Sequence, residues 1–142
     1  MNTFKFSLLY LKLVTLLIFV FSFIGFFTVS FDPFGYLEQQ LILNLYGTPT
    51  FPAEAIPAFT FAFSLFCLAS ILLAVFQYAI IHYGLEKKQK WAYYTMCLGT
   101  LIWIGGATLI SLILGTPSYI RYSVLTMIIL LVPPLVLLKK YF

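Results

Sequence analysis

The chain has 142 residues, of which 63% are hydrophobic and only 8% are charged. A soluble domain carries about 25% charged residues, so this composition excludes an ordinary water-soluble fold and predicts a membrane protein. The net charge of +4 does not indicate a nucleic-acid partner. The basic residues stand beside the ends of long apolar stretches, as orientation signals and contacts to anionic lipid do.

Four apolar stretches are long enough to cross a bilayer, at roughly 7–30, 57–82, 91–115 and 119–138. Each has about 20 residues or more, which matches a hydrocarbon layer of ~30 Å at ~1.5 Å per residue. Little length is left for a separate domain. We therefore predict an all-α fold, a four-helix transmembrane bundle that forms one membrane domain over residues 1–142.

The first stretch is interpreted as an uncleaved span and not as a signal peptide. Its apolar run continues to about Val29, far beyond the ~7–15 residues of a signal core, and no small-x-small cleavage site follows it. Lys12 interrupts this span near its start. Its ammonium group can reach the interface because the aliphatic stem can lie along the lipid.

The segment between the first two spans, residues 31–56, contains three acidic residues and no Lys or Arg. We therefore place it on the outer side. Asp32-Pro33 indicates a helix start, Gly47 indicates a helix stop, and apolar residues recur at helical spacing between them. We expect a short amphipathic helix in the outer interface, with a packed loop as the alternative.

The basic residues share one side of this arrangement. Two lysines stand at the start of the first span, three lie within 83–90, and Lys139 and Lys140 follow the fourth span. An even number of crossings brings all seven to one side, and the positive-inside rule makes that side cytoplasmic. Both termini are then cytoplasmic, only Arg121 lies outside, and the expected location is a bacterial inner (cell) membrane.

The third span carries a candidate helix-packing face made of Ala107, Ser111 and Gly115. Small residues at this spacing let helix backbones approach closely in lipid. In the fourth span, Pro133 and Pro134 each remove one helical hydrogen bond, so we expect a kink or an early end of the helix there.

A polar layer crosses all four spans at roughly one turn from the inner boundary. It contains Lys12, Gln77, Tyr78, Thr95 and Pro133. The functional interpretation is a small polar pocket near the inner leaflet for a lipid headgroup or another amphipathic ligand. The alternative is a set of ordinary interface residues at the ends of four helices.

The sequence offers no catalytic, cofactor or metal site. The single histidine excludes bis-histidine haem ligation within one chain, and no residues have metal-ligand spacing. No span carries a central Asp or Glu for an ion relay. Cys67 and Cys97 lack C-x-x-C spacing and differ in predicted depth, so we interpret them as small buried apolar residues and not as a disulfide.

Several short features follow one another along the chain. They are Tyr46-Gly47, Lys90-Trp91-Ala92, Trp103 with Ser111 eight residues later, and a proline in the last span. In this order the chain resembles a loose group of uncharacterised small four-span bacterial membrane proteins, from about Tyr46 to Pro134. Those relatives often have an acidic residue shortly after the second tryptophan, which this chain lacks. The resemblance implies a location and a span count but no reaction.

These patterns predict a small multi-pass integral membrane protein without enzyme activity or cofactor. We expect an accessory, scaffold or lipid-interacting protein whose partners are membrane lipids, with a homo-oligomer or a larger membrane complex beyond them. The alternative is an oligomeric channel or transporter subunit, and a membrane enzyme acting on lipid at the inner leaflet is a third interpretation. A water-filled polar path would favour the channel, and a dry bundle packed by Phe and Leu would favour the scaffold.

Overall fold

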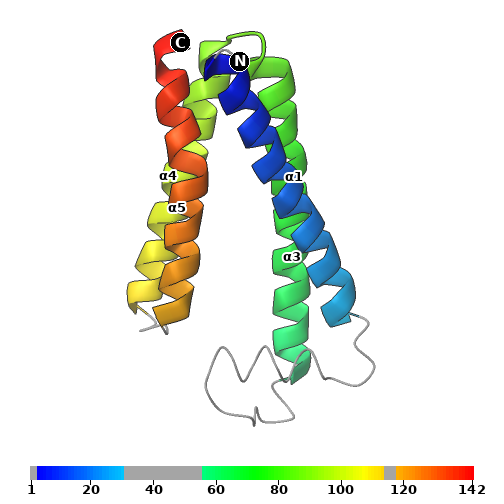
Figure 1. The fold of residues 1–142 in the computed structure, drawn as a ribbon. Coiled ribbons are helices and arrows are strands. Elements are labelled where there is room, and N and C mark those ends of the chain that lie inside the picture. Colours follow the sequence, from blue (N-terminus) through cyan, green and yellow to red (C-terminus); the bar gives the residue numbers. More distant parts are fainter. Residues whose placement is uncertain (1–2, 31–55, 114–117) are drawn as a thin grey trace. The chain divides into compact units, whose positions relative to one another are not determined.

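The structure is a computed structural model that describes residues 3–30, 56–113 and 118–142, without the side chains of 29–30, 56, 59, 110–111 and 118–124. The regular elements of this part are all helices (Figure 1), which confirms the all-α class for it. They are α1 (Thr3–Ser30), α3 (Ile56–Ala79), the π-helix η2 (Ile80–Leu85), α4 (Lys90–Ile113), α5 (Ser118–Leu138) and the 3-10 helix η3 (Lys139–Tyr141). The expected amphipathic helix falls within 31–55, outside the described residues.

Three segments of the described part are long and apolar enough to cross a membrane: Thr3–Thr28, Thr60–Leu85 and Lys90–Leu109. Large apolar side chains remain exposed along them, as Phe21 and Leu101 do at 69% each. Helices that are apolar all round and expose such side chains belong in lipid. The chain is thus compatible with a membrane protein. The predicted fourth span, at 119–138, stays a prediction, because the side chains of 118–124 at the start of α5 are not described.

Residue contacts divide the chain into two compact units. Unit 1 comprises residues 1–16 and 76–142, and unit 2 comprises residues 17–75. Helices α1 and α3 each contribute residues to both units. The prediction of one membrane domain over the whole chain stays a prediction.

In unit 1, η2 packs closely against α4 at Gly84. A Cβ atom added to Gly84 would lie 2.3 Å from the Cβ of Ala92 and 3.2 Å from the ring of Trp91, so only glycine fits there. Ile81 and Leu85 are fully buried beside it. The sequence places the end of the second span near residue 82. The helix instead continues as η2 to Leu85, because these side chains gain a buried position.

The turn between η2 and α4 is closed by two backbone hydrogen bonds. The Gln89 N–H donates to the carbonyl of Gly84, and the Lys88 N–H donates to the carbonyl of Leu85, both at 3.0 Å. This is the Schellman pattern, in which the position of Lys88 usually belongs to a glycine in left-handed conformation. Lys88 has a φ of 55° without being glycine. Such a backbone costs about 1–2 kcal/mol.

Helix α5 lies side by side with α4 in unit 1 (Figure 1) and passes through both of its prolines. It continues beyond Pro133 and Pro134 to Leu138, in agreement with the span predicted to residue 138. Of the two effects expected of the prolines, the early end is therefore wrong and the kink stays a prediction. Leu135 and Leu138 are buried at 5% and 0% exposure and hold the last turn in unit 1. Prolines take helical φ values, and in lipid an unwound backbone would expose more unpaired groups than the two lost donors.

In unit 2, α1 approaches α3 at Gly25. A Cβ atom there would lie 3.3 Å from the Cys67 Sγ, which is a tight contact but not an impossible one. Polar side chains bond within their own helix: the Thr28 hydroxyl donates to the carbonyl of Ile24 at 2.9 Å, and the Ser70 hydroxyl donates to that of Phe66 at 2.8 Å. These bonds satisfy hydroxyl groups where no water is available. Both cysteines of the chain are free. Cys67 is buried as predicted, whereas Cys97 is only half-buried.

Candidate functional site

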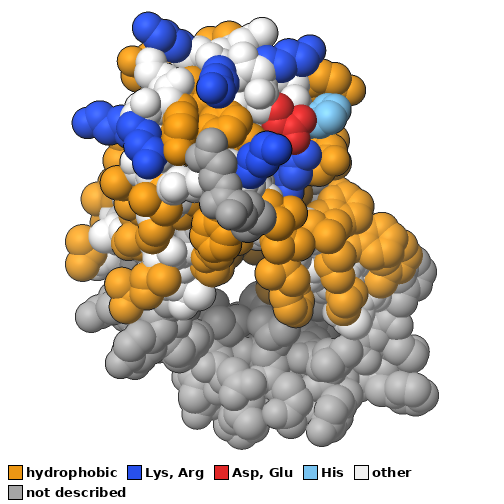
Figure 2. Space-filling view, turned by 45° about the horizontal axis from the view of Figure 1, so that its top comes forward, with side chains coloured by type: hydrophobic (Ala, Val, Ile, Leu, Met, Phe, Trp, Pro, Cys, Tyr) orange, Lys and Arg blue, Asp and Glu red, His pale blue; other side chains and the backbone are white. Residues whose placement is uncertain are grey.

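All seven lysines of the chain belong to unit 1. They gather at one end of this unit, where the start of α1, the η2–α4 turn and the C-terminal residues lie (Figure 2). Ring contacts connect these segments. The ring centroids of Phe4 and Tyr141 are 5.0 Å apart, and those of Phe4 and Phe142 are 6.4 Å apart. The Lys88 Nζ lies 5.3 Å from the ring centroid of Phe4. We call this part of unit 1 the lysine end.

At the lysine end, most contacts of the ammonium groups among the described residues are to aromatic rings and not to carboxylates. Phe142 stacks on Tyr93 at 5.1 Å with an interplanar angle of 11°. The Lys140 Nζ lies 5.1 Å from the ring centroid of Tyr141. Such cation–π contacts contribute about 0.5–1 kcal/mol at exposed sites. These contacts orient the ammonium groups. Because a ring carries no net charge, they do not neutralise the positive charge of the lysines.

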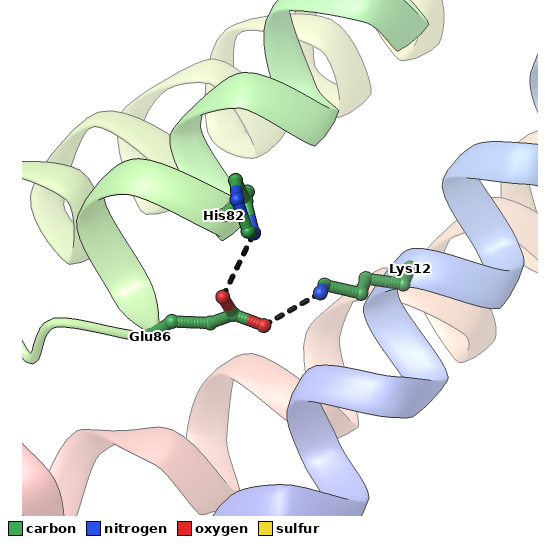
Figure 3. A network of polar contacts seen from close by, with 3 residues as sticks. All are labelled: Lys12, His82 and Glu86. Atoms are coloured by element: carbon green, nitrogen blue, oxygen red, sulfur yellow. Dashed lines mark hydrogen bonds and ion pairs between the residues drawn. The ribbon is translucent and has the colours of Figure 1, made fainter.

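One carboxylate stands among these cations, and it has two partners (Figure 3). The Lys12 Nζ donates to Oε1 of Glu86 at 2.5 Å, and the Nδ1 of His82 lies 2.9 Å from Oε2. Lys12 comes from α1 and His82 from η2, and Glu86 follows directly after η2. We call Lys12, His82 and Glu86 the triad. It connects α1 to the turn between η2 and α4.

The hydrogen bond from Lys12 holds the pKa of Glu86 below its ordinary value, and His82 adds to this effect while burial opposes it. The side chains of Lys12 and Glu86 are 25% and 35% exposed, so solvent screens the pair. Pairs of this kind contribute at most about 1 kcal/mol to stability. The triad therefore positions Lys12 more than it stabilises the fold.

Glu86 is the site residue that the sequence analysis missed. It follows His82 by four residues, which is the spacing of a side-chain pair on a helix. It is also the only acidic residue after position 54. Those two signals were sufficient to single it out, although its pairing with Lys12 was not predictable from spacing.

The structure brings together part of the predicted polar layer. The Lys12 Nζ lies 5.6 Å from the ring centroid of Tyr78. The Oε1 of Gln77 is buried and has no hydrogen-bond partner among the described residues. Thr95 and Pro133 have exposed side chains on α4 and α5. A pocket formed by all five residues stays a prediction.

A surface groove of about 390 Å³ lies beside the triad. It is lined by Phe4, Lys5, Leu8, Leu9, Lys12 and Glu86. Two ammonium groups therefore border an apolar wall, which is the chemistry of an amphiphile site.

Two further predictions concern the helix-packing face of the third span and metal binding. Ala107 is half-buried on α4, whereas the side chain of Ser111 and the whole of Gly115 lie outside the described residues, so the helix-packing face stays a prediction. Within the described ranges, no three His, Cys, Asp or Glu side chains lie close enough to hold a metal ion.

The chain matches no protein-family model, no curated protein and no solved structure. Its resemblance to small four-span bacterial membrane proteins stays a prediction. The chemistry of the lysine end and of the groove is thus the basis for any functional conclusion.

Proposed function

We propose that this chain is a four-span integral membrane protein whose lysine end contacts the anionic cytoplasmic leaflet of a bacterial inner membrane. Both termini lie on that side. The protein acts without catalysis, as an accessory, scaffold or lipid-interacting component.

The observation that supports this proposal is the gathering of seven lysines at one end of unit 1, where Glu86 is the only acidic side chain among the described residues. Like charges at this density repel one another unless counter-charges are present. Anionic headgroups supply them, with about 1 kcal/mol for each Lys near the surface. Rings such as Phe4 and Tyr141 suit the same depth, because aromatic side chains prefer the membrane interface.

The orientation is tested by cysteine labelling in intact cells, in a variant that lacks both native cysteines. A membrane-impermeant reagent is expected to label Thr50→Cys from outside and to label Gln89→Cys only after the membrane is opened. Labelling of Gln89→Cys alone in intact cells would reverse the proposed orientation.

The lipid contact is tested by thermal unfolding in vesicles with and without phosphatidylglycerol. Anionic lipid is expected to raise the unfolding midpoint, and added salt is expected to reduce that gain. Equal midpoints in both vesicles would contradict the lipid contact. Ion flux through the same vesicles would instead favour the channel alternative.

A further inference from the structure

We propose that the groove beside Lys12 binds one anionic phospholipid, with its phosphate held by Lys5 and Lys12 and an acyl chain lying against the leucines of α1. This inference rests on the proposed function and deepens it. It replaces a general attraction to the leaflet with a defined site for a single lipid molecule.

The lining residues of α1 form one stripe along the helix. Lys5, Leu8, Leu9 and Lys12 are spaced at i, i+3, i+4 and i+7, so they share one helical face. The two lysines are roughly 10 Å apart along the helix axis. Each ammonium group sits on a flexible four-carbon stem, so both can reach a phosphate placed between them.

The apolar part of the stripe continues away from the lysine end. Leu9, Leu13 and Leu16 follow one another at i, i+4 and i+7 and are 50%, 51% and 55% exposed. An acyl chain whose headgroup lies between the two lysines would pass along these three leucines. The groove thus places two lysines around Leu8 and Leu9, and the exposed Leu13 and Leu16 continue the apolar path on α1 beyond the groove.

Glu86 is the internal competitor for this headgroup. Its Oε1 accepts the hydrogen bond of Lys12, whereas Lys5 has no ion-pair partner among the described residues. A bound phosphate would accept hydrogen bonds from both Lys5 and Lys12, and it would displace the Glu86 carboxylate from Lys12. Displaced Glu86 keeps His82 as its partner, because that contact uses the other oxygen atom, at 2.9 Å. Removing the carboxylate should therefore strengthen lipid binding.

The test is a titration of the purified full-length protein in detergent with phosphatidylglycerol, followed by native mass spectrometry. Lys12→Gln and Lys5→Gln are each expected to weaken binding by about tenfold, the effect of losing one charge-assisted hydrogen bond. Lys139→Gln is the matched control, since it removes the same charge from the lysine end outside the groove. Because Lys139 acts on the lipid only through the general attraction of the lysine end, its loss is expected to weaken binding less than the loss of Lys12 does.

Glu86→Gln is expected to bind the lipid more tightly, which a damaged fold cannot produce. Because the loss of one negative charge also strengthens the general attraction to anionic lipid, the gain supports the groove only if Lys12→Gln abolishes it. Unchanged or weaker binding by Glu86→Gln would show that Glu86 does not compete with the lipid phosphate for Lys12. Equal losses for Lys12→Gln and Lys139→Gln would overturn the groove while the general lipid contact stands. No preference for phosphatidylglycerol over phosphatidylcholine in the wild type would overturn both proposals. Inorganic phosphate that competes as well as the lipid would overturn the assignment to a phospholipid.

Discussion

The two units differ in what holds their helices in register. In unit 1, an ion pair joins α1 to the turn after η2, and a glycine lets η2 touch α4. In the described part of unit 2, residues 17–30 and 56–75 include no charged side chain, and the hydroxyls of Thr28 and Ser70 bond within their own helices. Lipid is as apolar as leucine, so apolar side chains alone align helices only weakly. Unit 1 should therefore be the more sensitive of the two to single substitutions.

The largest effect is expected at Gly84. In Gly84→Ala the new Cβ would lie 2.3 Å from that of Ala92, so η2 and α4 must move apart. Overpacking of this kind costs about 1–3 kcal/mol. Thermal unfolding in detergent micelles measures the loss as a lower midpoint than that of the wild type.

Gly99→Ala is the matched control for Gly84→Ala. It lies on α4, and no atom stands within 4 Å of its added Cβ. We expect it to be neutral or to stabilise the helix by up to about 1 kcal/mol. If Gly84→Ala behaves like Gly99→Ala, the close approach in unit 1 does not exist.

The second effect concerns Lys88, whose φ of 55° suits glycine. Lys88→Gly and Lys88→Ala both remove the ammonium group from the ring of Phe4, but only the former relieves the backbone. Lys88→Gly should therefore be the more stable of the two variants by about 1 kcal/mol. Equal unfolding midpoints for the two variants would show that the turn carries no such strain.

The third effect is the pH dependence that comes from Glu86. Its pKa is lowered in the folded protein, so its contribution is present at neutral pH and is lost as the pH falls through the lowered pKa. Stability of the wild type should fall more steeply than that of Glu86→Gln below about pH 5, by at most about 1 kcal/mol. Parallel stability curves for the two proteins below about pH 5 would contradict the prediction.

The smallest effect is expected in unit 2, at Gly25. In Gly25→Ala the added Cβ lies 3.3 Å from the Cys67 Sγ, which a small side-chain shift relieves. We expect a change within about 0.5 kcal/mol. A loss as large as that of Gly84→Ala would remove the contrast between the two units.

The helices were predictable from the sequence because their signal is local. Long apolar runs fix the existence and approximate bounds of α1, α3 and α4. The extension of the second helix to Leu85 was missed, since it depends on the fit of Gly84 against α4 and not on hydropathy. The span predicted to residue 138 agrees with the end of α5 at Leu138, because packing at Leu135 outweighs the local preference of the prolines for an early end.

The candidate site was predictable only in part. The polar layer includes Lys12 and Tyr78, which do meet in the structure. The bond of Glu86 to Lys12 was not predictable because it joins residues 74 positions apart, and such a pairing has no local signature. The groove depends on the same contact, since five of its six lining residues come from α1 and only Glu86 comes from elsewhere.

The position of Trp91 gives the turn an intrinsic optical probe. Its indole N–H donates to the side-chain oxygen of Gln89, and its ring borders Gly84, while about half of the side chain is exposed. The chain contains only one other tryptophan, Trp103. Replacing Trp103 with phenylalanine would therefore leave a single tryptophan, three residues beyond Lys88, which can be excited apart from the ten tyrosines. Its fluorescence would follow the opening of the η2–α4 turn in real time, without any attached dye.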